Sequence, residues 1–354
     1  MAPALVKLRQ SKPIPQFHPV VAGKPRTDEK RQEPHRSPSA SPARPRRKPP
    51  WVLLAALGLG ALGLVASVGL INRLWPLQDQ GLSTEEQNGE AAPLASPPSR
   101  PITVLLIGSD ADRLAAASNG AAPAGAPNSD TLLLFRVEPG GPLQILAIPN
   151  ELAVKVPGQK TVQPLGSLFK QGGPALSAGA VAELVGLDPG QPERYVVLPR
   201  SALRELVDGL GGLEVNLDQP LTYKDKSQAY SIDLQGGLQR LKGAQVEQLV
   251  RYVDKVQGEA GRRMRQQQVI TQLLSELVRP EQWAQLPERW QRLTSQLDTN
   301  LSQEEALSLI TAGLRQDKPV RYSQIPLEPP AKPEQTLRQI SAKAPTPLWP
   351  PAKP

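Results

Sequence analysis

A run of 21 residues without a single charge, from Trp51 to Ile71, constrains this chain more than any other feature of its sequence. At about 1.5 Å per residue, a helix of this length spans the roughly 30 Å hydrocarbon core of a bilayer. A cleaved signal peptide has a shorter apolar run behind a short basic start, whereas fifty residues precede this one. A soluble core helix usually keeps a polar face. The run therefore predicts one transmembrane helix over residues 51–72.

The distribution of charge predicts the orientation of that helix. Residues 1–50 hold twelve Lys and Arg against three acidic residues, a net charge of +9, and the cluster RPRRK directly precedes the apolar run. The positive-inside rule places such a tail in the cytoplasm, so we expect a single-pass protein of the plasma membrane with an extracytoplasmic domain. The whole chain carries +8, so the tail accounts for the basic balance, and we expect no nucleic-acid partner.

Composition divides the chain outside the apolar run into four segments. Residues 1–50 are rich in Pro, Ser, Lys and Arg and are expected to be a disordered cytoplasmic tail. Residues 73–100 have no periodicity and read as a flexible linker. Residues 101–328 are long enough for one sizeable core. The proline-rich stretch 329–354 is expected to be a flexible tail.

Within residues 101–328, short apolar runs alternate with segments of helical periodicity. Apolar runs closed by Gly or Pro are typical of strands buried on both faces, and apolar residues at i, i+3, i+4 and i+7 indicate amphipathic helices. The pattern predicts an α/β domain with a central mixed β-sheet flanked by helices. We expect strands at 102–108, 131–137, 143–149, 194–197 and 213–217, and helices at 175–185, 201–207, 246–253, 261–278, 281–296 and 302–314.

The absence of two residue types limits the chemistry. The chain has no cysteine, which excludes disulfides, thiolate catalysis and zinc–thiolate sites. Its two histidines, His18 and His35, lie in the tail, so the exported part has no histidine base and no Ser-His-Asp triad. No GxxxxGK[ST] sequence or GxSxG elbow is present. Carboxylates, hydroxyls, Arg, Lys and an oxygen-bound cation such as Mg²⁺ remain.

Acidic residues occur at the ends of the first two expected strands. Asp110 and Asp112 follow the first strand and Asp130 precedes the second, so the carboxylates meet at one edge if the strands pair. One or two carboxylates that leave room for water and phosphate oxygens suit Mg²⁺. The alternative, that each Asp only closes a turn, is the more common role for any one of them.

Three arginines lie at the start of the helix expected over 261–278. Arg262, Arg263 and Arg265 would stand in its first turn, where the helix dipole makes cations unfavourable by about 0.3–1 kcal/mol each. An anion bound between them would explain that placement, and phosphate matches both backbone amides and guanidinium groups. Arg262 and Arg265 are i, i+3 neighbours that can hold one group together. The alternative is a solvated face screened by Glu259.

These motifs, in this order and behind one anchor, resemble the LytR-CpsA-Psr family of bacterial cell-envelope phosphotransferases. The resemblance covers roughly residues 102–327. It rests on VLLIGSD at 104–110, SDT at 129–131, ELVDGLGGLEVNL at 205–217, and the series YSIDLQGGLQRLKGAQ, LVRY, GEAGR and RQQQ within 230–268.

The resemblance implies a function. Family members transfer a glycopolymer from a polyprenyl-diphosphate carrier to peptidoglycan or another envelope acceptor, forming a phosphodiester and releasing polyprenyl phosphate. Asp110 and Asp130 match positions expected to hold Mg²⁺, and together with Arg262 they are the candidate catalytic residues. The prenyl chain would lie in an apolar cavity between sheet and helices. The positions expected to contact the diphosphate are matched by Arg113, Arg251, Arg262, Arg265 and Gln266.

Several positions depart from the family motifs. The motif IPRDT is IPNEL here, with Asn150 and Glu151, and RxR ends in Val253, which would complete the apolar stripe of its helix. GDxGR is GEAGR, with Glu259. Because two cations are missing, a second hypothesis is a catalytically weakened domain that binds polyprenyl phosphates as a scaffold or regulator. A transcription regulator is disfavoured because no helix-turn-helix pattern occurs.

Overall fold

The computed structural model describes residues 6–7, 95–114, 116, 126–225, 230–313, 318–332 and 335–351. The predicted transmembrane helix over 51–72 lies outside these residues, as do nearly all of the expected tail and most of the linker. Within the described ranges, no helix is both long enough and apolar enough to cross a bilayer.

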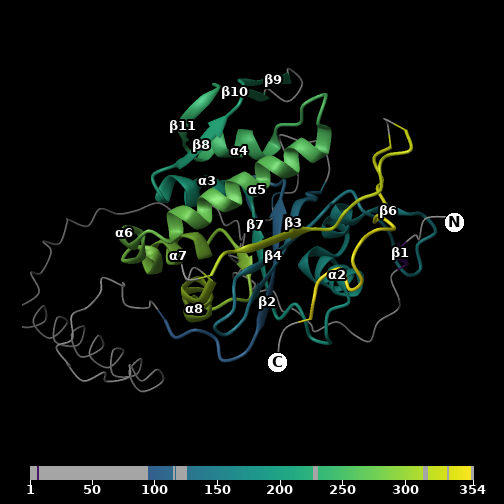
Figure 1. The fold of residues 1–354 in the computed structure, drawn as a ribbon, viewed down its shortest axis with the longest axis horizontal. Helices are drawn as coiled ribbons and strands as arrows, with labels where there is room; N and C mark the ends of the chain where they lie inside the picture. Colours follow the sequence, from purple (N-terminus) through teal and green to yellow (C-terminus); the bar gives the residue numbers. More distant parts are fainter. Residues whose placement is uncertain are drawn as a thin grey trace, which may run out of the picture. The chain divides into compact units, whose positions relative to one another are not determined.

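A six-stranded mixed sheet lies at the centre of the domain (Figure 1). Its strand order is β12-β7-β2-β3-β4-β13; β2, β3 and β4 form an antiparallel meander, while β7 lies parallel to β2 and β13 parallel to β4. The predicted α/β fold with a central mixed sheet is confirmed. The strands are β2 (Ile102–Ser109), β3 (Ser129–Val137), β4 (Gln144–Ile148), β7 (Arg194–Leu198), β12 (Asp298–Thr299) and β13 (Arg321–Gln324).

Both faces of the sheet are covered, which explains its continuous apolar strands. Alternate residues of β3 point to opposite sides: Leu132 and Leu134 pack with helix α2, and Leu133 and Phe135 pack with helices α5 and α8. Figure 1 shows α2 and α5 on opposite sides of the strands. The helices are α2 (Leu168–Val185), α5 (Gly258–Leu277) and α8 (Gln303–Gly313).

A second hydrophobic core lies between α5 and two β-hairpins. Two hairpins, β8 with β11 and β9 with β10, pack with α3, α4 and α5 around Leu213, Val215 and Leu234. Of these strands only β8 is predicted from the sequence. The elements are α3 (Arg200–Gly209), β8 (Leu213–Leu217), β9 (Leu221–Asp225), β10 (Tyr230–Leu234), β11 (Gly237–Leu241) and α4 (Gly243–Arg251).

Three predicted helices differ from the structure. The helix predicted at 281–296 is two helices, α6 (Pro280–Trp283) and α7 (Leu286–Thr294), because Pro287 lacks an N–H and favours a helix start. The helix at 246–253 ends at Arg251, so Val253 does not complete its stripe and is 43% exposed. Helix α2 begins seven residues before 175, with a break at Gly173, whose φ is +60°.

The proline-rich C-terminus is packed on the domain, contrary to the expected flexible tail. We call residues 335–351 the C-terminal strap. The Arg338 N–H donates to the Glu151 carbonyl (2.9 Å), and the Arg338 carbonyl accepts from the Ala153 N–H (2.8 Å). Trp349 is only 4% exposed, and the Arg136 guanidinium lies 3.9 Å from its ring centroid. Nearby are β1 (Val6–Lys7), β5 (Ala153–Lys155), β6 (Gln163–Pro164) and the 3₁₀ helix η1 (Leu165–Ser167).

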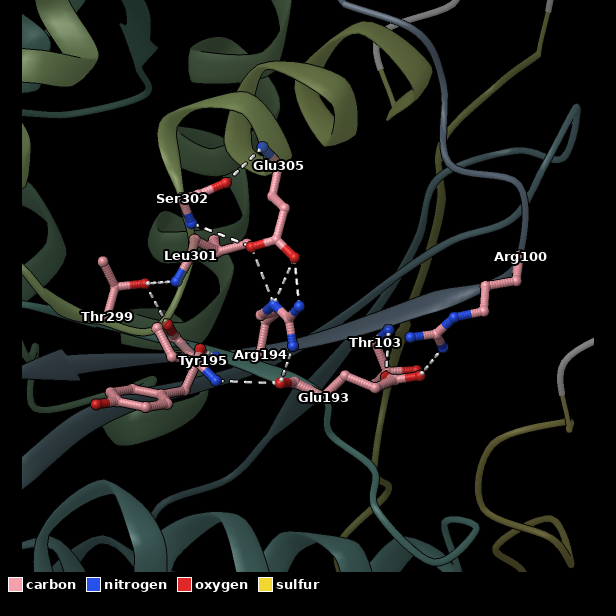
Figure 2. Close-up of polar contacts among 10 residues, drawn as sticks. Arg100, Thr103, Glu193, Arg194, Tyr195, Thr299, Leu301, Ser302 and Glu305 are labelled. Atoms are coloured by element: carbon pink, nitrogen blue, oxygen red, sulfur yellow. Dashed lines mark hydrogen bonds and ion pairs between the residues drawn. The ribbon is translucent and has the colours of Figure 1, made fainter. Parts of the chain in front are cut away.

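A polar network joins strand β7, next to the β12 edge of the sheet, to helix α8 (Figure 2). Ser302 and Glu305 form a capping box: the Ser302 hydroxyl accepts from the Glu305 N–H and the Glu305 carboxylate accepts from the Ser302 N–H, both at 3.1 Å. The same carboxylate accepts two hydrogen bonds from Arg194 Nε, at 3.1 and 3.2 Å. Helix α8 is thereby tied to β7.

Candidate functional site

The pairing of β2 with β3 brings two of the predicted acidic residues to one edge of the sheet. Ser109 lies opposite Ser129 in the ladder, so Asp110 follows one strand where Asp130 begins the other. Asp110 is 8% exposed, and its Oδ1 accepts the Asn128 N–H at 2.9 Å. Asp130 is more open and faces two hollows of the domain surface.

Asp112 has a different place. Its carboxylate accepts a hydrogen bond from Arg204 Nη2 at 2.7 Å, and that bond holds the pKa of Asp112 below its ordinary value. Asp112 therefore fixes the loop after β2 to α3, as the turn interpretation expects. Arg113 also lies apart from the other candidate residues. Its side chain is 83% exposed, and its ion pair among the described residues is with Asp112, at 3.9 Å.

The arginines of α5 diverge. The helix begins at Gly258 rather than 261, so Arg262 lies beyond the first turn, where Glu259 already complements the dipole. Arg262 pairs with Glu259 at 2.7 Å and with Asp130 at 3.7 Å. Arg265 instead donates to the Tyr252 carbonyl at 2.7 Å. Arg262 and Arg265 therefore have different partners in this structure, and the expectation that they hold one group together stays a prediction.

Arg263 carries an interaction that the motif comparison did not suggest. It forms an ion pair with Glu151, which stands in IPNEL where the family motif has an aspartate. Both side chains are largely buried. Asn150, in place of the motif arginine, lies beside them in the same wall of the surface. The acidic residue of the motif is thus neutralised by a helix arginine.

An apolar cavity of about 260 Å³ lies between the sheet and α3, α4 and α5. Leu106, Leu133 and Phe135 line it from the sheet, and many Leu, Ile and Val side chains line it from the helices. Its polar lining residues come from the end of β2, the start of β3, the start of α3, and helices α4 and α5. They are Ser109, Asp130, Thr131, Arg200, Glu247, Arg251 and Gln266.

Arg251 and Gln266 are held at this cavity by local contacts. Arg251 pairs with Glu247 at 3.2 Å and stacks over Tyr230, with 4.1 Å from the guanidinium carbon to the ring centroid. Gln266 donates to the Val250 carbonyl at 3.4 Å. Two of the sequence-predicted diphosphate residues are therefore cavity residues. Arg265 and Arg113 line neither the cavity nor the groove described next.

A wide polar groove of about 1370 Å³ lies on the other side of Asp130. Arg262, Arg263 and Lys170 contribute cations to it, and amide and hydroxyl side chains such as Asn150 and Ser167 contribute neutral hydrogen-bonding groups. The C-terminal strap forms part of its wall, through 335–338. Among the described residues, Asp130 is the one that lines both groove and cavity.

The two candidate carboxylates have the donor chemistry that Mg²⁺ prefers. Asp110 and Asp130 come from paired strands and offer only oxygen donors, which fits Mg²⁺ held by one or two carboxylates. No group of three or more acidic, His or Cys side chains able to hold a metal occurs in the described part of the chain. The fit therefore depends on substrate oxygens and water completing the coordination.

Sequence reasoning missed a cluster beside this edge. Glu247 is 6% exposed and pairs with Arg200 at 2.7 Å, with Arg251, and with Arg204. Burial alone would raise the pKa of Glu247, but the hydrogen bonds from Arg204 and Arg200 outweigh it and hold that pKa below its ordinary value. The i, i+4 spacing of Arg200 and Arg204 was visible, but their partner lies more than 40 positions away.

Two relatives are similar in sequence to this chain over most of its length. Regulatory protein MsrR of Staphylococcus aureus (strain COL) is 23% identical over 231 residues, which cover 64% of this chain and 65% of MsrR, slightly less than two thirds. The polyisoprenyl-teichoic acid–peptidoglycan teichoic acid transferase TagV of Bacillus subtilis is 22% identical over 265 residues, covering 73% of this chain and 63% of TagV.

Solved structures share the fold. The crystal structure of B. subtilis TagV superposes with a TM-score of 0.57 at 18% identity, covering 71% of this chain and 94% of that one. A LytR-Csp2A-Psr enzyme from Actinomyces oris gives a TM-score of 0.51 at 18% identity, covering 72% and 93%. The family model LytR_cpsA_psr matches residues 77–343, three quarters of the chain. This chain belongs to the LytR_cpsA_psr family.

Proposed function

We propose that the chain transfers a glycopolymer from a polyprenyl-diphosphate carrier to peptidoglycan or another envelope acceptor, with Mg²⁺ as cofactor. The observation that carries the proposal is the position of Asp130 between an apolar cavity and a polar groove. An amphiphilic donor needs both: a dry space for its prenyl chain and a hydrogen-bonding surface for its sugars. Its diphosphate would lie at the boundary, beside Asp130.

The residues around Asp130 suit that chemistry. Arg262 on the groove side and Arg251 with Gln266 on the cavity side can hold the phosphate oxygens by charge-assisted or neutral hydrogen bonds. Asp110 and Asp130 would hold Mg²⁺, which neutralises charge on a diphosphate. On the cavity side, the apolar surroundings strengthen these interactions relative to water.

The reaction is a phosphoryl transfer. An acceptor hydroxyl oxygen forms a bond to the glycan-bearing phosphorus, and the bond from that phosphorus to the bridging oxygen breaks. The leaving polyprenyl phosphate keeps the electron pair of that bond, and the proton of the hydroxyl passes to water. Arginine contacts to the oxygens of both phosphates stabilise the charge that develops on the leaving group.

A membrane setting accompanies the proposal. The uncharged run Trp51–Ile71 would anchor the chain in the plasma membrane with its N-terminus in the cytoplasm, which places the domain on the side where envelope polymers are assembled. TagV, a relative of 22% identity, carries the name of a teichoic acid transferase.

One observation favours a second candidate, a binding module without turnover. Val253 replaces the second arginine of RxR and lies outside α4, 43% exposed, so no cation is supplied from that position. Such a module would retain polyprenyl phosphates and regulate envelope assembly.

The test uses the full-length chain in detergent with Mg²⁺ and a polyprenyl-diphosphate oligosaccharide, and measures release of polyprenyl phosphate. Arg262→Ala should reduce release by about 100-fold, since it removes charge-assisted hydrogen bonds of roughly 1.5–3 kcal/mol. Arg292→Ala, an exposed arginine of α7, is the matched control and should release product at the wild-type rate. Tight lipid retention without release, from a donor that TagV consumes, would support the binding module.

A further inference from the structure

Arg200 is a cation at the apolar cavity that no family motif quoted above includes. It is the first residue of α3, and its side chain is only 14% exposed. Its Nε donates to the Asp110 carbonyl at 2.8 Å, and its Nη1 pairs with Glu247 at 2.7 Å. The guanidinium is therefore tied to the backbone of Asp110, one of the two candidate metal ligands.

The network around Arg200 carries a surplus of positive charge. Three guanidiniums, those of Arg200, Arg204 and Arg251, share two carboxylates, Glu247 and Asp112. The pKa of Glu247 is held below its ordinary value, so Glu247 is ionised; Arg204 and Asp112 balance each other away from the cavity, which leaves the two cavity arginines, Arg200 and Arg251, against the single carboxylate of Glu247. Beside an apolar wall, that charge attracts an anion more strongly than it would in open water.

The cluster presents only part of itself to the cavity. Arg200, Glu247 and Arg251 line it, whereas Arg204 and Asp112 do not. Among the described residues that line the cavity, Arg200 and Arg251 are the two cations, and Asp130 and Gln266 lie at the same cavity. An apolar space with two arginines among its polar lining residues matches an amphiphile with an anionic head and a hydrocarbon chain.

We propose that Arg200 contacts the phosphate group of the lipid donor together with Arg251, and that Glu247 holds both arginines in place. The inference rests on the proposed function and deepens it. It also supplies a cation in a site where Asn150 and Val253 stand at motif positions for arginine. The competing explanation is that Arg200 only pairs with Glu247 to fix α3 against α4.

The experiment compares two probes that differ only in the head group: geranylgeranyl diphosphate and geranylgeraniol. Both are titrated into the full-length chain in detergent with Mg²⁺. Arg200→Gln should weaken diphosphate binding at least about tenfold, equivalent to about 1.4 kcal/mol, while the affinity for the alcohol stays within about twofold. Arg200→Lys, which keeps the charge and loses the planar fork, should fall in between.

Arg204→Gln is the matched control, because Arg204 shares the Glu247 carboxylate and the same helix but does not line the cavity. It should leave the preference for the diphosphate over the alcohol near its wild-type value. Thermal melts of each variant verify folding. Equal effects of the Arg200 and Arg204 substitutions, or no effect of the former, would overturn the assignment while leaving the proposed function standing. A wild-type chain that binds both probes equally would refute the proposed function and the inference with it.

Discussion

Replacing Trp349 with alanine should destabilise the domain, because the indole is buried although it lies in a stretch whose composition is typical of a flexible tail. The side chain is 4% exposed and belongs to the core on the α2 side of the sheet. Arg136, itself 2% exposed, stacks on the ring and donates to the Pro350 carbonyl. The substitution removes the ring and one side of the Arg136 environment together.

The size of the effect follows from these contacts. Replacing a buried Trp with Ala typically costs about 3–5 kcal/mol, of which the stacked arginine accounts for roughly 0.5–2 kcal/mol. The strap lies at the surface and solvent can fill the space, so we expect the lower end, about 3 kcal/mol. For a domain of roughly 230 residues, at about 2–4 °C per kcal/mol, the melting temperature should fall by about 6–12 °C.

The assay is thermal unfolding of the full-length chain, followed by far-UV circular dichroism, with Lys343→Ala as control. Lys343 is an exposed residue of the same strap, and its substitution should leave the melting temperature within about 1 °C. A Trp349→Ala variant that melts with the wild type would show that the strap does not pack in solution. It would also restore the flexible tail expected from composition.

Two further predictions concern the stability of other regions. Because the hydrogen bond from Arg194 lowers the pKa of Glu305, the pair stabilises the fold above the ordinary pKa of a glutamate and loses that contribution as pH falls through the lowered value. Glu305→Gln, which keeps the capping geometry with Ser302, should cost about 0.5–1 kcal/mol at pH 7 and flatten the acid limb of urea-unfolding stability between about pH 5 and 3; an unchanged limb would contradict this. Gly243→Ala would place a Cβ 2.3 Å from the Arg204 carbonyl oxygen, so about 1–3 kcal/mol should be lost in the same assay, whereas Gly209→Ala, whose Cβ would meet only the Arg289 side chain at an ordinary 3.9 Å, should be neutral.

The sheet was readable from the sequence where its strands are apolar and close in the chain. β2, β3 and β4 are continuous apolar runs that follow one another in the chain, and burial on both faces leaves few other structures for them. β13 was not readable, because its sequence RYSQ has no apolar pattern and it pairs with residues of β4 that lie 177 positions earlier. The packing of the C-terminal strap was not predicted for a related reason. The composition of this stretch is dominated by proline, and composition does not indicate that the single Trp349 is buried.

The residues of the candidate site were likewise only partly predictable from the sequence. Asp110 and Asp130 could be placed together because they flank strands expected to pair, and Arg262 does reach Asp130. The position of Arg265 could not be foreseen, since it depends on where α5 begins and on the Tyr252 carbonyl. Glu247 and Arg200 meet only after α3 and α4 have packed, and no local signal reports that packing.

The parallel pairing of β4 with β13 has a consequence for how the chain acquires its structure during synthesis. β4 is complete once residue 148 has been made, yet its outer edge waits for residues 321–324, more than half of the domain later. Until then, apolar β4 presents unpaired backbone groups that can pair with any other extended chain. The final strand, β13, is polar and mostly exposed. When it pairs with β4, the edge of the sheet changes from an apolar strand to a solvated one. A chain interrupted before residue 321 would therefore be more prone to aggregation than its missing length alone suggests.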